Sequence, residues 1–250
     1  VNSLSGKYIT AEDVGMETRD MDIIREVTPH VTGISESNGG SGNPSPVTAF
    51  GVYIGMKAAA KHQFGSDSLA GKKVAVQGIG HVGAYLVEYL VAEGADVTIT
   101  DINQDALQKL SAQHGVKVVP PDLIYGIDMD IYAPCALGAT VNDETLSQLK
   151  CAIIAGAANN QLKEEAKHGQ ILMDRGIIYA PDFALNAGGV INCFSEVEGL
   201  SLEWAKQKAE EIYTTIDNIL IRSKQEGLPS YQVANRIAEE RVQAKGSLNI

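Results

Sequence analysis

A glycine-rich turn offers the clearest chemistry in this chain. It reads, in order, Gly78-Ile79-Gly80-His81-Val82-Gly83. Three glycines at this spacing allow a tight turn, a close backbone approach to a pyrophosphate and close helix–strand packing. The helix that follows would offer its free N-terminal N–H groups to the phosphates. Taken alone the pattern is weak, because strand-to-helix turns of this kind also occur for packing.

A carboxylate at the end of the next strand-like run strengthens this interpretation. Asp101 follows the β-prone run at residues 96–100, 18 residues after the glycine-rich turn. There it could accept hydrogen bonds from adenosine ribose hydroxyls. Ile102 and Asn103 offer no cation for a 2′-phosphate, which Asp101 would also repel, so the pattern favours NAD over NADP. The alternative is that Asp101 only caps the helix that begins near Gln104.

Alternating strand and helix patterns must position this turn. Strands are expected at the apolar runs of residues 73–77, 96–100, 129–133, 152–155 and 177–179. Helical patterns separate most of them, at residues 84–93, 106–113 and 161–175. This alternation predicts βαβ units and a doubly wound, Rossmann-like parallel α/β sheet. His81 is expected on the surface of the helix that the turn opens.

Further helical patterns flank the predicted sheet. A Ser- and Gly-rich stretch at residues 35–46 is expected to be a loop, and a long helix should begin at Val47. From Leu202, apolar residues recur at three- and four-residue steps, so one face of that helix must pack on something. Gly227-Leu228-Pro229 should end it before a last helix over residues 231–242.

Composition and charge exclude several classes of protein. The 250 residues are 44% hydrophobic and 20% charged, which is typical of globular chains. A formal net charge of −11 without a Lys/Arg cluster argues against nucleic-acid binding. No apolar stretch is long enough for a membrane span and no signal peptide is recognisable, so we expect a soluble, cytoplasmic protein. The three cysteines are expected to be reduced, buried hydrophobes, and no metal site is predicted.

Six segments together resemble the amino-acid dehydrogenases of the Glu/Leu/Phe/Val group, most closely its leucine dehydrogenases. They follow the family's order at residues 8–15, 39–49, 74–80, 133–139, 154–162 and 179–192. The resemblance implies reversible NAD-dependent oxidative deamination of a branched-chain, leucine-like L-amino acid to its 2-oxo acid and ammonia. It also implies a homo-oligomer. Phenylalanine, valine and glutamate dehydrogenases of the same group are the alternatives within the family.

The resemblance assigns roles to single residues. Asp13 matches the catalytic aspartate, which exchanges protons with the substrate amine. Contacts to the cofactor are implied for Gly78, Ile79, Gly80, His81, Val82, Gly83, Asp101, Ile102, Thr48, Ala136 and Asn159. Contacts to the substrate are implied for Ala11, Thr48, Asn186, Val190 and Cys193. Met16 departs from the family pattern, and so does Cys193, where an apolar residue is expected.

Simpler explanations exist for several of these residues. Asp13 could be a solvated turn carboxylate, and the pair Asn159-Asn160 could simply end a strand. The pair Gly188-Gly189 could simply permit close helix packing.

One part of the family pattern has no counterpart in the sequence. The family's catalytic lysine lies in a glycine-rich segment of an upstream substrate domain, which neither Gly6-Lys7 nor Gly71-Lys72 resembles. We therefore expect that the chain alone binds NAD without turning over leucine. A stand-alone NAD-binding module without turnover is the alternative. The expected division is a remnant of the substrate domain at 1–34, a hinge loop and linking helix at 35–70, an NAD-binding Rossmann domain at 71–200 and C-terminal helices returning toward the substrate domain at 201–250.

Overall fold

A six-stranded parallel sheet forms the centre of the molecule in a computed structural model, which describes residues 1–13 and 15–246. The strands are β1 (Lys73–Gln77), β2 (Asp96–Thr100), β3 (Lys117–Val118), β4 (Ile131–Pro134), β5 (Ile153–Ile154) and β6 (Ile178–Tyr179). Their order is β3-β2-β1-β4-β5-β6, and all neighbours are parallel. This is the doubly wound Rossmann order, which reverses direction between β1 and β4. The predicted fold class is confirmed.

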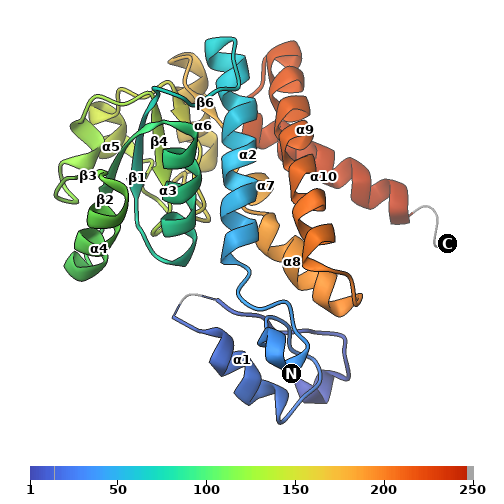
Figure 1. Cartoon of the computed structure of the whole chain (residues 1–250). Coiled ribbons are helices and arrows are strands. Elements are labelled where there is room, and N and C mark those ends of the chain that lie inside the picture. The colour runs from blue at the N-terminus through green and yellow to red at the C-terminus, as the bar shows by residue number, and fades with distance from the viewer. Residues whose placement is uncertain (14, 247–250) are drawn as a thin grey trace.

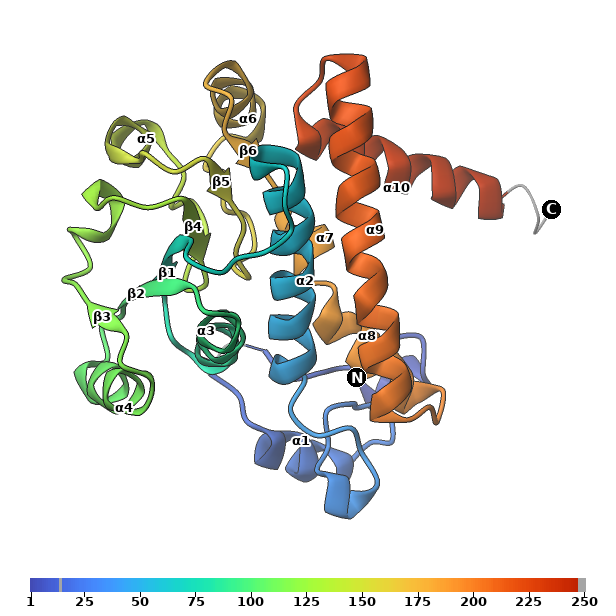
Figure 2. The ribbon, with the colours of Figure 1, turned by 45° about the horizontal axis from the view of Figure 1, so that its top comes forward.

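Helices cover both faces of this sheet (Figure 2). On one face lie α2 (Ser45–Phe64), α3 (His81–Glu93) and α4 (Gln104–His114), and on the other lie α5 (Asp143–Gln148) and α6 (Glu165–Asp174). Alternate side chains of β1 therefore join different cores: Val74 and Val76 pack in the larger cluster, and Ala75 packs in the smaller one. Burial on both faces explains why the strands read as continuous apolar runs.

The long helix α2 packs along α9 (Leu202–Glu226) beside the sheet (Figure 1). Gly51 and Gly55 allow the two helices to approach closely, because a Cβ at these positions would lie 2.6 Å from Ile212 and 3.2 Å from Ile216. The apolar face predicted from Leu202 onward is therefore covered by α2. The chain then turns at residues 227–229, as expected, into α10 (Ser230–Gly246).

Residues 1–13 and 15–43 form a small layer at the N-terminal end of α2 (Figure 1). They contain η1 (Asn2–Leu4), α1 (Thr18–Arg25) and η2 (Glu36–Asn38), with a small core of Met21, Val31 and Ile34. The stretch expected to be a loop thus holds one short helix, and α2 begins two residues before its predicted start.

Several short elements were not predicted from the sequence. They are η1, η2, β3, α5, η3 (Ile124–Gly126), α7 (Asp182–Leu185) and α8 (Gly188–Val197). Each is short or begins with residues of low helix propensity, so its pattern is weak. All three cysteines are free thiols, with Cys151 buried and the other two half-buried. Within the described ranges, no helix has the length and apolarity that a bilayer crossing requires.

Candidate functional site

The glycine-rich turn connects β1 to α3 at the point where the sheet order reverses. Gly78 adopts a φ of +94°, and a Cβ there would lie 2.6 Å from the Cβ of Ala136. A Cβ on Gly83 would lie 2.0 Å from the carbonyl oxygen of Gly78. A Cβ on Gly80, the N-cap of α3, would meet no atom within 4 Å. Two glycines therefore serve packing, and the third leaves space in front of a helix N-terminus, where anions bind.

Asp101 stands directly after β2 and braces this turn. One carboxylate oxygen accepts the backbone N–H of Ile79 at 2.7 Å, and the other accepts that of Asn103 at 2.9 Å. The alternative that Asp101 caps α4 is wrong, because the N-cap is Asn103, whose side chain accepts from the N–H of Ala106. Ile102, predicted to contact the cofactor, is 89% exposed beside the turn.

Two predicted amide side chains meet next to the sheet. Asn186 Nδ2 donates to Asn159 Oδ1 at 2.5 Å and to the carbonyl oxygen of Ala157 at 3.1 Å. Asn159 follows β5 and Asn186 follows α7, so the contact joins two segments that lie 27 residues apart. The two amides fix each other's position.

The N-terminal ends of α2 and α8 lie against each other. Thr48 Oγ1 donates to the carbonyl oxygen of Pro44 at 3.0 Å. A Cβ on Gly189 would lie 2.9 Å from Thr48 Oγ1, and one on Gly188 would lie 2.3 Å from the carbonyl oxygen of Val47. The simpler explanation of the Gly188-Gly189 pair, close helix packing, therefore holds, and that packing sets Thr48 beside the start of α8.

The segment with the predicted catalytic aspartate lies between α8 and the glycine-rich turn. Thr10 forms a bridge with Val31, and the next residue, Thr32, donates from Oγ1 to the carbonyl oxygen of Cys193 at 3.3 Å. Asp13 is exposed, and Ala11 is half-buried. The intervening Glu12 places its carboxylate 3.7 Å from Nδ1 of His81.

The predicted substrate-contacting residues of α8 are not all enclosed. Val190 is 75% exposed, whereas Cys193 is half-buried. Burial raises the pKa of the Cys193 thiol, so it stays neutral and can serve as a small apolar surface. Val190 would need a ligand or another surface to become part of a closed pocket.

Glu196, which the sequence did not single out, holds the loop at residues 33–41 onto α8. Its Oε2 accepts the N–H of Gly33 at 2.9 Å, the N–H of Ser41 at 2.8 Å and the hydroxyl of Ser41 at 2.7 Å. The buried Asn192 also donates to Ser41 Oγ at 2.9 Å. One carboxylate oxygen thus fixes both ends of the loop that leads into α2.

Replacing Glu196 with alanine should lower the free energy of unfolding by about 2 kcal/mol, because three charge-assisted hydrogen bonds are lost and some are replaced by water. Urea unfolding would measure this change. Glu198→Ala, at an exposed carboxylate next to the same helix, should change it by less than about 0.5 kcal/mol. Equal effects of the two substitutions would contradict the assignment.

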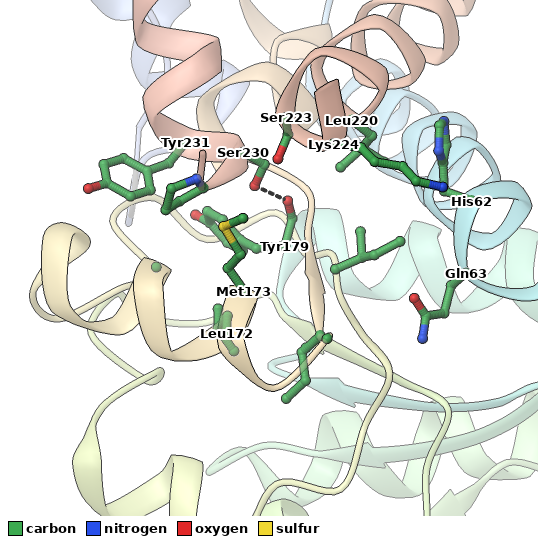
Figure 3. A pocket seen from close by; sticks show the side chains of 15 residues that line it. His62, Gln63, Leu172, Met173, Tyr179, Leu220, Ser223, Lys224, Ser230 and Tyr231 are labelled. Atoms are coloured by element: carbon green, nitrogen blue, oxygen red, sulfur yellow. Dashed lines mark hydrogen bonds between the residues drawn. The ribbon is translucent and has the colours of Figure 1, made fainter. Parts of the chain in front are cut away.

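A pocket of about 300 Å³ lies elsewhere, at the other end of α2 (Figure 3). It is lined by the C-terminal turn of α2, by α6, by β6 and by the α9–α10 connection, where Ser230 Oγ donates to the carbonyl oxygen of Tyr179 at 2.6 Å. His62 at its rim is about 21 Å along α2 from Thr48, at 1.5 Å per residue. The sequence-predicted residues do not line this pocket.

A group of possible metal ligands lies where α6 begins and consists of Asp143, Glu164 and His168. His168 is fully buried, and its Nδ1 accepts the backbone N–H of Glu164 at 2.9 Å. Its Nε2 must therefore carry the proton, and it points at Asp143 at 3.5 Å. With the proton on Nε2, this nitrogen has no lone pair to offer a metal ion. Asp143 is also already paired with Lys167, at 2.6 Å. His168 thus holds the start of α6, and the two carboxylates pair with Lys167.

Comparison with known proteins bears on this arrangement. The family model described as glutamate/leucine/phenylalanine/valine dehydrogenase matches residues 39–106 and 97–247. Leucine dehydrogenase from Bacillus cereus is 57% identical over 97% of this chain, which spans 66% of that protein's length. Valine dehydrogenase from Streptomyces albus is 46% identical over 97% of this chain and 67% of its own. Among solved structures, L-tryptophan dehydrogenase from Nostoc punctiforme matches with a TM-score of 0.85 and 38% identity, over 98% of this chain and 70% of its own.

Proposed function

The chain belongs to the glutamate/leucine/phenylalanine/valine dehydrogenase family, and from this premise we propose that it forms the NAD-binding part of an L-amino-acid dehydrogenase. The reaction is the reversible oxidative deamination of a branched aliphatic amino acid to its 2-oxo acid and ammonia. The chain spans about two thirds of the length of its leucine dehydrogenase relatives, so substrate and turnover are proposals for the enzyme that carries it.

The observation that carries the proposal is the open position at Gly80. It lies at the N-terminus of α3, at the switch point of a doubly wound sheet, where dinucleotides bind in such folds. At Gly78 and Gly83 the space for a Cβ is filled by neighbouring atoms, so the open space is specific to Gly80. Asp101 stands at the end of β2, in the place suited to the adenosine ribose.

The residues around this space have distinct proposed tasks. Bound NAD would supply the hydride acceptor. Thr48 and Asn159 would hold the nicotinamide and its ribose, and Asn186, which fixes Asn159, would orient the substrate. Asp13 would accept a proton from the substrate amine and return it in the reverse direction. The protein mainly supplies positioning, because the hydride moves directly from the substrate to the nicotinamide.

A leucine-like substrate is favoured over the amino acids that other members of the family use. Ala11, Val190 and Cys193 would offer an apolar wall to a branched side chain. The greater identity to leucine dehydrogenase than to valine dehydrogenase supports this order. The test is the rate of NADH formation, followed at 340 nm, by the enzyme that carries the chain with leucine, valine, phenylalanine or glutamate. A preference for glutamate would overturn the leucine-like assignment.

The first test of cofactor binding is an NADH titration of the 250-residue chain, followed by fluorescence. We expect saturable binding, and its absence would refute the proposed function. If NADH binds but the enzyme that carries the chain turns over no amino acid, the alternative holds and the chain is an NAD-binding module. The domain division given above and assembly into a homo-oligomer stay predictions, which limited proteolysis and sedimentation would test.

Asp101→Asn should narrow the preference for NADH over NADPH by about tenfold, because the substitution removes the charge that repels a 2′-phosphate. An amide oxygen can still accept the N–H of Ile79, so the turn should keep its shape, and only the second bond, from the N–H of Asn103, is lost. The ratio of the two dissociation constants is the measurement. Asp105→Asn, in the first turn of α4, is the control and should leave the ratio unchanged. An unchanged ratio in Asp101→Asn would remove Asp101 from the cofactor site.

A further inference from the structure

The carboxylate of Glu12 is nearly buried next to the glycine-rich turn. Its side chain is 7% exposed, and Oε1 lies 3.7 Å from Nδ1 of His81, whose own side chain is 58% exposed. The other carboxylate oxygen receives only a long hydrogen bond from Thr18 Oγ1 at 3.4 Å. Burial raises the pKa of Glu12, and the nearby His81 opposes this rise. His81 therefore provides charge compensation that the surroundings of Glu12 otherwise lack.

The other charged groups around Glu12 do not compensate it. On the side of α1, Glu17 and Asp20 are both acidic and raise its pKa further. On the side of α8, Glu12 raises the pKa of the Cys193 thiol. Among the described groups that act on the pKa of Glu12, His81 is the one basic side chain.

His81 also occupies a special place on α3. It is the first residue of the helix and directly follows Gly80, whose open Cβ position marks the expected phosphate site. His81 therefore follows the residue where the phosphates are expected, and its imidazole contacts Glu12. Glu12 in turn directly precedes Asp13, so a short covalent path joins this contact to the predicted catalytic carboxylate.

We propose that His81 neutralises Glu12 beside the dinucleotide phosphates and thereby lets cofactor binding hold the Asp13 segment against the turn. The inference rests on the proposed function, because it needs a dinucleotide at Gly80. With a neutral residue at position 81, the Glu12 carboxylate and the phosphates would repel each other across the turn. A protonated His81 attracts both anions and offsets this repulsion, so that cofactor binding and the position of the Glu12 segment become coupled. His81 is then a positioning residue that acts on Asp13 through Glu12.

A double-mutant cycle on NADH affinity tests the proposal. The titration uses the 250-residue chain at pH 6, where an imidazole is more fully protonated. His81→Asn should weaken NADH binding about threefold, the size expected for one partly exposed ion pair. Adding Glu12→Gln should restore the affinity, because the repelling charge is gone. Adding Glu26→Gln instead, at an exposed carboxylate just after α1 in the same N-terminal layer, should restore nothing. A double variant Glu12→Gln/His81→Asn that binds as weakly as His81→Asn would overturn the proposal.

Hydrogen exchange gives a readout that a merely structural role would not change. NADH should slow amide exchange in residues 8–13 of the wild-type chain, and this slowing should be lost in His81→Asn. Equal slowing in both proteins would contradict the link. A wild-type chain that binds no NADH would refute the proposed function, whereas NADH binding with an additive cycle would refute only the role of His81.

Discussion

Replacing Gly80 with alanine should lower the NADH affinity of the chain by about 100-fold and leave its melting temperature within about 2 °C of the wild type. The methyl group would occupy the space through which the backbone approaches the pyrophosphate. It would strain nothing in the free protein, because Gly80 has a φ of −64° and no atom lies within 4 Å of the added Cβ. Fluorescence titration and thermal unfolding measure the two quantities separately.

Gly83→Ala is the matched control within the same turn. Its Cβ would lie 2.0 Å from the carbonyl oxygen of Gly78, so the turn must shift. Both the melting temperature and the NADH affinity should therefore fall. If Gly80→Ala binds NADH as tightly as the wild type, the phosphates do not lie against Gly80, and the glycine-rich turn serves packing alone.

The fold could be predicted wherever the determining interactions are local. The turn at residues 78–83 depends on glycine spacing within one loop, and the buried strands depend on continuous apolar runs. The elements missed were those with little pattern of their own. The two residues of β3, Lys117 and Val118, are both exposed at the sheet edge, and α8 begins with two glycines. These elements form because the surrounding chain provides a surface for them.

The contacts that assemble the site could not be predicted. Glu196 binds Gly33, 163 residues away in the sequence, and no spacing rule connects them. In the sequence, Glu12 is only the residue before Asp13. The fold shows that its carboxylate turns toward His81. Sequence reasoning therefore identified side chains with suitable chemistry. It missed the carboxylates that hold the small N-terminal layer, the loop at residues 33–41 and the glycine-rich turn in one arrangement.

That arrangement makes Asp13→Asn the most demanding test of the proposed chemistry. The substrate amine must lose a proton before hydride can leave the neighbouring carbon, and an amide cannot accept that proton. We expect the rate of leucine-dependent NADH formation in the enzyme that carries the chain to fall by roughly 10²- to 10⁴-fold. The NADH affinity should stay within about twofold of wild type, because the substitution is isosteric and leaves Glu12 and His81 in place.

The affinity measurement also separates lost chemistry from lost folding, since a misfolded variant would not bind NADH. Glu26→Gln, at an exposed carboxylate just after α1, should leave the rate unchanged. If Asp13→Asn kept more than about a tenth of the wild-type rate, a proton-transfer role would be too small for a general base. The carboxylate of Glu12, nearly buried and one residue away, would then be the next group to test by the same assay.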